Sequence, residues 1–144
     1  MAKKRRKSGR PQMLRRNVEI SSFSVRVRLD AVHRKGEDPH IEGEPWLELR
    51  GTATEAVRDV RDVRISMYPR DTLQVGPARP ASVGAVIDAR PELSFVLTWP
   101  QVDFDRIWAL ALSGRLTHGS LYFTKPHYNT GLVVNASFSN EAEE

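Results

Sequence analysis

The sequence predicts an all-β domain: an antiparallel β-sandwich or partly closed barrel of about seven strands, with one short helix before the last hairpin. Three observations predict this class. Apolar and polar residues alternate in most of the apolar segments, which is the period of a strand with one buried face. Turn-forming residues recur at short intervals between these segments. No alternation of strands with long helical segments is visible, which disfavours a parallel α/β sheet.

Composition sets the limits of what the chain can be. Its 144 residues favour one domain, and 40% hydrophobic residues suffice for a modest core. The absence of cysteine excludes disulfides and thiolate metal sites and fits a reducing, cytoplasmic compartment. No apolar run approaches the roughly 20 residues that span a bilayer, and no signal-peptide apolar stretch follows the basic start. We therefore expect a cytoplasmic protein without membrane contact.

Positive charge is concentrated at the start of the chain. Residues 1–16 contain eight basic residues and no acidic one: Lys3, Lys4, Arg5, Arg6, Lys7, Arg10, Arg15 and Arg16. The remainder holds fourteen basic and eighteen acidic residues. We predict a disordered arm over 1–16, a single domain over 17–140 and an acidic tail over 141–144. The arm is expected to contact nucleic acid or another polyanion, or an acidic protein; a solubilising tail without a partner is the alternative.

The first strand is expected over residues 23–31, half buried through an alternating apolar face. That face consists of Phe23, Val25, Val27, Leu29 and Ala31. The following segment, 34–45, contains two Gly and two Pro residues and is predicted to be a surface loop. It also contains Glu37, Asp38, His40, Glu42 and Glu44. These residues lack the ligand spacing of an EF-hand, so at most a weakly bound hard cation is expected there.

Four further strands are predicted before the helix. The second covers 46–54 and the third 60–68, with a reversal over 54–58 and a bulge at the entry of the third. An irregular, proline-containing connection follows over 69–80. A hairpin then joins strands at 83–87 and 93–99. The inward residues are expected to be Leu47, Leu49, Gly51, Ala53, Val63, Ile65, Met67, Val83, Ala85, Ile87, Leu93, Phe95, Leu97 and Trp99.

The helix is predicted over about 103–113. Asp103 is expected to cap its start, since a carboxylate can accept from the free N–H groups of the first turn. An apolar stripe at three- and four-residue spacing includes Phe104, Ile107 and Trp108. Gly114 is expected to end the helix in the left-handed conformation.

The last hairpin follows the helix. Leu121 and Phe123 are predicted to face inward on its first strand, and Leu132, Val134, Ala136 and Phe138 on its second. The residues between the strands, 125–131, are expected to form the turn. The predicted core therefore includes Phe95, Leu97, Trp108, Leu121, Phe123, Val134 and Phe138.

No catalytic motif is visible. The chain lacks a P-loop, a G-x-G-x-x-G segment and a G-x-S-x-G segment, and its four histidines are scattered. We predict no catalytic residue, no cofactor and no metal. A secondary binding site is predicted around the last hairpin, where aromatic and basic residues could stack on bases and neutralise phosphates. It consists of Arg115, Tyr122, Lys125, His127 and Tyr128.

Three hypotheses on function follow. The leading one is a non-enzymatic binding module whose basic arm contacts nucleic acid or another polyanion. The second is a structural or assembly protein, in which the arm and an edge strand contact other proteins, including a second copy. The third and least supported is a small enzyme with a pocket near the helix start.

Overall fold

The computed structural model describes residues 11–70 and 82–141. Its elements are β1 (Met13–Val32), β2 (His40–Val57), β3 (Val60–Arg70), β4 (Gly84–Asp88), β5 (Leu93–Pro100), α1 (Gln101–Leu112), β6 (His118–Thr124) and β7 (Gly131–Ser139). Seven strands and one short helix before the last hairpin confirm the predicted all-β class. In the described ranges, no helix is long and apolar enough to cross a membrane.

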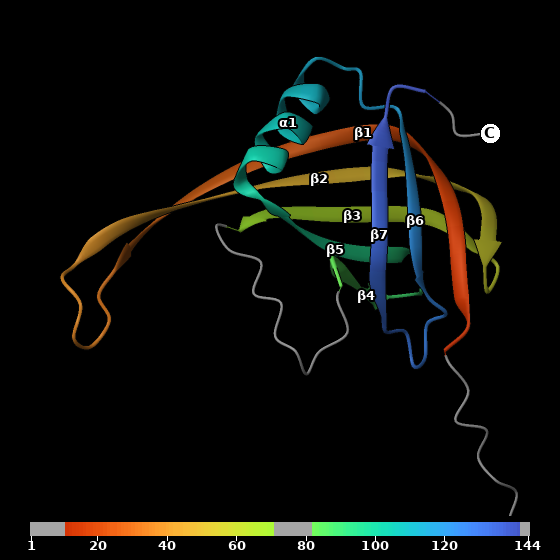
Figure 1. The fold of residues 1–144 in the computed structure, drawn as a ribbon, viewed down its shortest axis with the longest axis horizontal. Helices are drawn as coiled ribbons and strands as arrows, with labels where there is room; N and C mark the ends of the chain where they lie inside the picture. Colours follow the sequence, from red (N-terminus) through yellow and green to blue (C-terminus); the bar gives the residue numbers. More distant parts are fainter. Residues whose placement is uncertain (1–10, 71–81, 142–144) are drawn as a thin grey trace, which may run out of the picture.

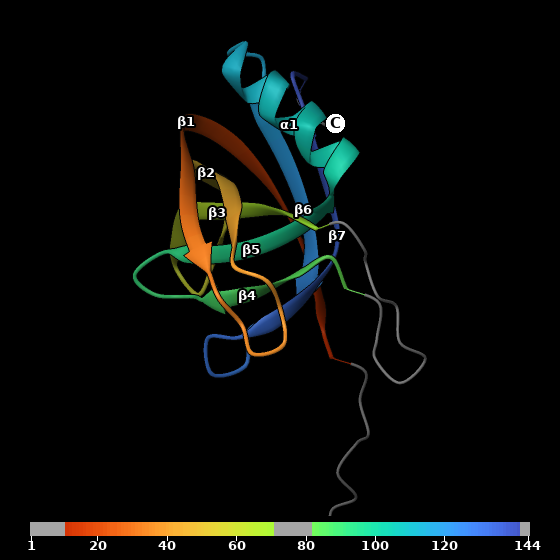
Figure 2. The same cartoon turned by 90° about the vertical axis from the view of Figure 1, so that its left-hand side faces the viewer.

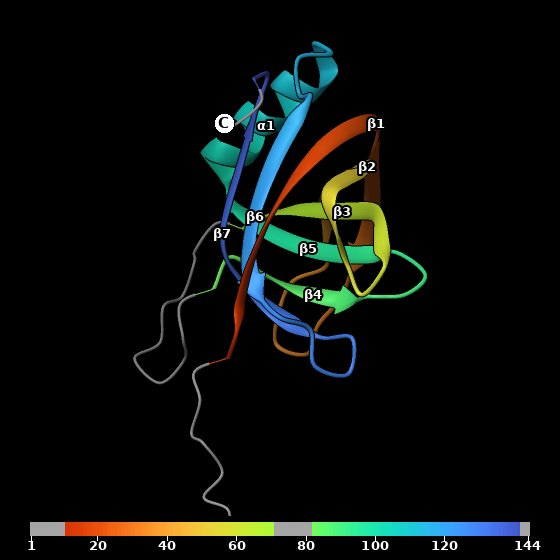
Figure 3. The ribbon, with the colours of Figure 1, turned by 90° about the vertical axis from the view of Figure 1, so that its right-hand side faces the viewer.

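The strands form one sheet that closes on itself in the order β1-β2-β3-β5-β4-β7-β6 (Figure 3). β1 closes the ring because its two parts pair with different neighbours. Residues Met13–Glu19 pair with β6, and residues Val18–Val32 pair with β2. The register with β2 shifts between Ile20 and Ser22, where β1 leaves β6. A bulge of this kind lets a strand bend from one part of a barrel to another.

β6 and β7 cross in front of β2, β3 and β5 (Figure 1). The neighbouring strands are antiparallel except for β3 and β5, which run parallel. This parallel pair corrects the expectation of a wholly antiparallel sheet. It arises because the β4–β5 hairpin enters the sheet with β5 beside β3 and with β4 beside β7.

The core lies inside the ring. It is lined by alternate residues of β2, β3, β5 and β6 and by one face of α1. The predicted core positions Phe95, Leu97, Leu121 and Phe123 are confirmed, since each is at most 1% exposed. Trp108 and Phe138 are partly buried and pack against this core.

The predicted burial of Val134 is wrong. Val134 is exposed, whereas its neighbour Val133 is fully buried. The cause is a register shift between β6 and β7: Tyr122 lies opposite Asn135, but Phe123 lies opposite Val133. Val134 is therefore the extra residue of a bulge, and the residues before it change face. For the same reason Leu132 is exposed.

β4 differs from the prediction in a similar way. Val86 lies opposite Phe95 and is buried, whereas Ile87 is exposed. The register between β4 and β5 shifts between Val86 and Asp88, so Ile87 is the unpaired residue. The predicted inward face of residues 83, 85 and 87 is therefore wrong for Ile87 and also for Ala85, which lies opposite Val96 on the face away from Val86.

α1 begins two residues earlier than predicted. Its N-cap is Pro100, with φ −53°, and no side chain caps it, so the predicted capping role of Asp103 is wrong. Pro100 itself is not helical, since its ψ is 144°, and the helix starts at the next residue, Gln101. Phe104, Ile107 and Ala111 form the buried face, as the apolar spacing predicted.

Gly114 ends α1 as predicted. Its φ is +75°, in the left-handed region. The Gly114 N–H donates to the carbonyl of Ala111, and the Arg115 N–H to that of Leu110. These bonds satisfy carbonyl groups of the last turn, as in other left-handed helix ends.

β1 and β2 continue beyond the ring as a two-stranded ribbon, residues 22–46, which projects to the left in Figure 1 and towards the viewer in Figure 2. β1 pairs with β6 only up to Glu19, and β2 with β3 only from Leu47 onward. The expected half-burial of residues 23–31 is therefore wrong, because no strand or helix of the described ranges covers this part of β1. The predicted loop 34–45 is shorter, since β2 already begins at His40.

The chain's ends bear on the predicted arm and tail. β1 begins at Met13, so Arg15 and Arg16 belong to the sheet and not to a disordered arm. Residues 1–10 lie outside the described part, as do 142–144 of the predicted tail. The predicted connection 69–80 starts later, because β3 extends to Arg70; residues 71–81 also lie outside the described part.

The turns of the β2–β3 and β6–β7 hairpins have similar backbone geometry. Arg58 and Asp59 have φ values of 48° and 67°, and Tyr128 and Asn129 have values of 50° and 69°. Two successive positive φ values match the twist of antiparallel strands. The Nη2 atom of Arg58 donates to the carbonyl of Pro126 at 2.6 Å, which ties the two turns together.

Candidate nucleic-acid interface

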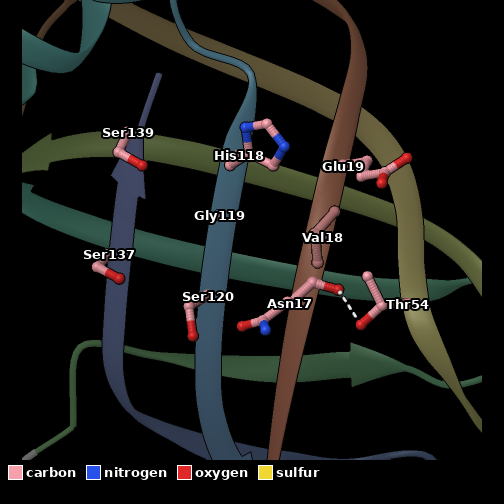
Figure 4. Close-up of a pocket in the computed structure, with 9 residues that line it drawn as sticks. All are labelled: Asn17, Val18, Glu19, Thr54, His118, Gly119, Ser120, Ser137 and Ser139. Carbon is pink, nitrogen blue, oxygen red and sulfur yellow. Dashed lines mark hydrogen bonds between the residues drawn. The ribbon is translucent and has the colours of Figure 1, made fainter. Parts of the chain in front are cut away.

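The outer face of β1, β6 and β7 is a continuous polar surface. Asn17 lies opposite Ser120, which in turn lies opposite Ser137. Two residues further along each strand, Glu19, His118 and Ser139 form a second row. Opposing residues of antiparallel strands point to the same face, so both rows lie side by side (Figure 4). They line, with Thr54 of β2, a hollow of about 80 Å³.

Gly119 separates this hollow from the core. It lies opposite Phe138 in the register, and a Cβ atom at Gly119 would come within 2.7 Å of the Phe138 ring. Only a glycine lets the ring lie flat against the inner side of β6. The ring therefore closes the core beneath the hollow, and the polar residues stay on the outside.

The hollow offers an unsatisfied acceptor. Thr54 Oγ1 donates to the Asn17 carbonyl at 3.3 Å (Figure 4). The Asn17 Oδ1 atom is itself buried and has no hydrogen-bond partner among the described residues. A ligand N–H or O–H group would satisfy this acceptor if the Asn17 side chain turned towards the hollow.

Arg15 extends the polar face along β1. Its guanidinium lies 5.1 Å from the centre of the Tyr122 ring, and its Nη1 atom donates to Ser120 Oγ at 3.3 Å. Arg15 is exposed, whereas Ser120 beneath it is buried. Tyr122 and Ser120 therefore hold an exposed guanidinium plane against the sheet.

Arg16 has a different environment from Arg15. Its side chain is only 16% exposed and its Nη1 lies 3.7 Å from the Glu55 carboxylate. Its guanidinium also donates to the carbonyls of Arg15 and Ala56. Arg16 therefore stabilises the N-terminal part of β1, and its charge is already matched. The other predicted arm residues, Lys3, Lys4, Arg5, Arg6, Lys7 and Arg10, lie outside the described residues.

The secondary candidate residues do not form one site. Arg115 precedes β6, whereas Lys125, His127 and Tyr128 follow it. Seven residues of strand place these two groups roughly 20 Å apart. Tyr122 lies between them on the outer face. Tyr128 is 85% exposed, and the centroid of its ring lies 4.2 Å from that of the His127 ring.

Sequence reasoning missed most of the hollow. Asn17, Glu19, His118, Ser137 and Ser139 were not among the candidates, although their alternation with inward-facing residues was visible. The sequence alone does not give the pairing register of β1, β6 and β7, and this register places their polar residues in rows.

The hollow does not assemble an acid–base pair. His118 Nδ1 lies 2.9 Å from Thr117 Oγ1. Within residues 11–70 and 82–141, the histidine that pairs with a carboxylate is His40, on the ribbon.

The acidic residues of the ribbon tip pair with bases. Arg34 lies 2.9 Å from Glu42 and 3.5 Å from Glu37, and His40 lies 2.9 Å from Glu42. The hydrogen bonds from Arg34 and then His40 lower the pKa of Glu42 to about 2. In turn, the bond to Glu42 raises the His40 pKa above 6.5. No group of three or more metal-ligating side chains is found in the described ranges.

Comparison with protein families, with curated proteins and with solved structures gave no match to this chain.

Proposed function

We propose that this protein is a non-enzymatic binding module that contacts nucleic acid or another polyanion through its basic N-terminal residues and the adjoining outer face of β1 and β6. One observation carries the proposal: the exposed guanidinium of Arg15 lies over the Tyr122 ring at the root of the most basic segment of the chain. Proteins use such guanidinium planes to stack on unpaired bases and to neutralise phosphates.

The basic segment is within reach of this face. Six of the eight basic residues precede β1, and Arg10 is five residues from Arg15. Five residues span at most about 17 Å. A strand of nucleic acid bound at Arg15 would thus be within reach of Arg10, and the cations at positions 3–7 are tethered at most 12 residues from Arg15, about 40 Å of chain. Their charge favours phosphate groups without regard to sequence.

The hollow supports a shallow contact. Its volume of about 80 Å³ is well below the roughly 300–1,000 Å³ of sites that enclose small molecules. The hydroxyl and amide groups around it can bond to phosphate, sugar or base edges. The lack of cysteine suits a reducing compartment, so we place this function in the cytoplasm.

Anisotropy of a labelled single-stranded oligonucleotide tests the proposal. Arg15→Ser should weaken binding about tenfold at low salt, since one stacking contact contributes about 1–3 kcal/mol. Arg106→Ser is the matched control, because Arg106 is exposed on α1 and is not among the residues of this face. Equal affinities of the two variants would exclude the Arg15 face. Competition by heparin would distinguish a general polyanion site from one for nucleic acid.

A second candidate function is assembly with other protein copies. The observation in its favour is the ribbon, whose apolar face is exposed and whose two edges pair with no other strand of the described residues. Exposed apolar patches on sheet proteins commonly mark protein contacts.

A further inference from the structure

The ribbon has one apolar face and one charged face. Phe23 lies opposite Leu49, Val27 opposite Pro45 and Ala31 opposite Ile41. These pairs continue the inward face of β2, on which Leu47 and Leu49 are buried in the core. The apolar face is therefore an extension of the core surface beyond the ring.

The charged face is satisfied within the ribbon. Arg28 pairs with Asp30 at 2.9 Å and with Glu44 at 3.8 Å. The guanidinium of Arg26 lies 5.9 Å from the Trp46 ring. This face needs no partner and suits solvent.

The apolar face, in contrast, is left in water. Val27, Leu29 and Ile41 are 64%, 72% and 74% exposed, and Phe23 and Val25 are also exposed. Together these five side chains expose on the order of 500 Å², near the upper end for the largest patch of a monomer. A two-stranded hairpin alone is only marginally stable in water. A covering layer would stabilise it.

We infer that this apolar face packs against the same face of a second copy of the chain. Polyanions are disfavoured because the ribbon carries four basic and five acidic residues. The face itself presents aliphatic and aromatic side chains, which complement an identical surface. A two-fold arrangement would bury on the order of 1,000 Å² in all, which reaches the lower limit of specific interfaces. The inference is independent of polyanion binding and names the surface that assembly would use.

Light scattering of the full chain tests this inference. The parent should have a mass near twice its 16.3 kDa. Leu29→Lys should reduce the mass to that of one chain, because it places a charge in the apolar interface. Ser24→Lys is the matched control: it adds the same charge on the opposite face of the same strand and should leave the dimer intact. A circular-dichroism melt checks that both variants fold.

Cross-linking gives a second measurement that does not depend on a charge variant. The chain has no cysteine. Any disulfide must then come from the introduced residue. Val27 is the central residue of the apolar positions 23–31, so a two-fold axis through the middle of this face would bring the two copies of Val27 together. Val27→Cys should form a disulfide-linked dimer under mild oxidation, and Ser24→Cys, on the opposite face, should not. A parent that stays at 16.3 kDa at all concentrations, or a dimer that Leu29→Lys leaves intact, would overturn the inference. A monomeric parent would assign the face to a different protein.

Discussion

The rings of Phe95 and Phe123 meet edge to face across the interior of the barrel, with 5.1 Å between their centroids. Phe95 comes from β5 and Phe123 from β6, two strands that are not neighbours in the sheet. The contact therefore joins β6, which belongs with β7 to the crossing strands, to β5 on the other side of the core. Its loss would leave a cavity between them.

Phe123→Ala should lower the free energy of unfolding by about 3–5 kcal/mol, the usual cost of removing a buried phenyl ring. Urea denaturation followed by circular dichroism measures this change. Tyr128→Ala is the control, since Tyr128 is an exposed aromatic residue of the same hairpin. It should change the free energy by no more than about 0.5 kcal/mol. Similar melts for parent and Phe123→Ala would contradict the core assignment.

Gly114→Val should also destabilise the fold, but through the backbone. Apart from its two chain neighbours, no described residue has an atom within 4 Å of a Cβ placed at Gly114, so the cost does not come from a clash. It comes from the φ of +75°, which a β-branched residue strongly disfavours and which costs about 1–2 kcal/mol even for simpler side chains. Gly114→Asn should retain more of the stability, because asparagine tolerates this region. Equal thermal midpoints for the Val and Asn variants would show that the backbone conformation is not the cause.

The alternating patterns predicted the buried residues of a strand correctly where the opposite side of the ring covers that strand's apolar face. In β3 and β5, the alternate residues Val63, Ile65, Phe95 and Leu97 are all buried. In β1 the same pattern predicted burial that is absent. Alternation shows that a strand has an apolar face, but what covers that face depends on which strands lie above it. No strand or helix in the described part of the chain covers Leu29.

The remaining errors have one physical origin. The bulges at Val134 and Ile87 depend on hydrogen bonds to a partner strand, and the parallel β3–β5 pair depends on where a hairpin joins the sheet. None of these is encoded in local periodicity. For the same reason the sequence did not predict that Arg15 and Tyr122 belong to one site. They are more than 100 residues apart, and the pairing of β1 with β6 brings them together.

The ribbon tip should respond to pH through His40. Its raised pKa means that the folded state binds the proton more tightly, so pairing with Glu42 stabilises the tip below pH 6.5. That contribution is lost as the pH rises through the folded-state pKa. The low pKa of Glu42 acts in the opposite range: its contribution is present above pH 4.5 and is lost as the pH falls to about 2.

An NMR titration of His40 measures this effect. Glu42→Gln should lower the His40 pKa towards 6.5, because it removes the hydrogen bond that contributes most to the shift. Glu55→Gln, which alters an acid beside Arg16, should leave it unchanged. A parent His40 pKa at or below 6.5 would show that the pair does not form in solution.

The salt dependence of binding separates the N-terminal cations from the folded face. The logarithm of the affinity for duplex DNA falls with the logarithm of salt concentration by about 0.9 per phosphate neutralised. If about half of the eight cations in residues 1–16 bind phosphates, the slope should be near −4. Sequence preference should be weak, since phosphates carry no base identity.

Deletion of residues 1–10 removes six of these cations and precedes β1, so it should leave the thermal melt unchanged. Arg16 is already paired with Glu55, which leaves Arg15 as the cation of this segment that can still bind phosphate. The slope should therefore fall to about −1, and most of the affinity should be lost. A truncated protein that keeps both its affinity and its slope would show that the basic segment only aids solubility. Binding would then have to come from the folded domain, and Arg15 and Tyr122, followed by Lys125 and Tyr128, would be the first residues to substitute.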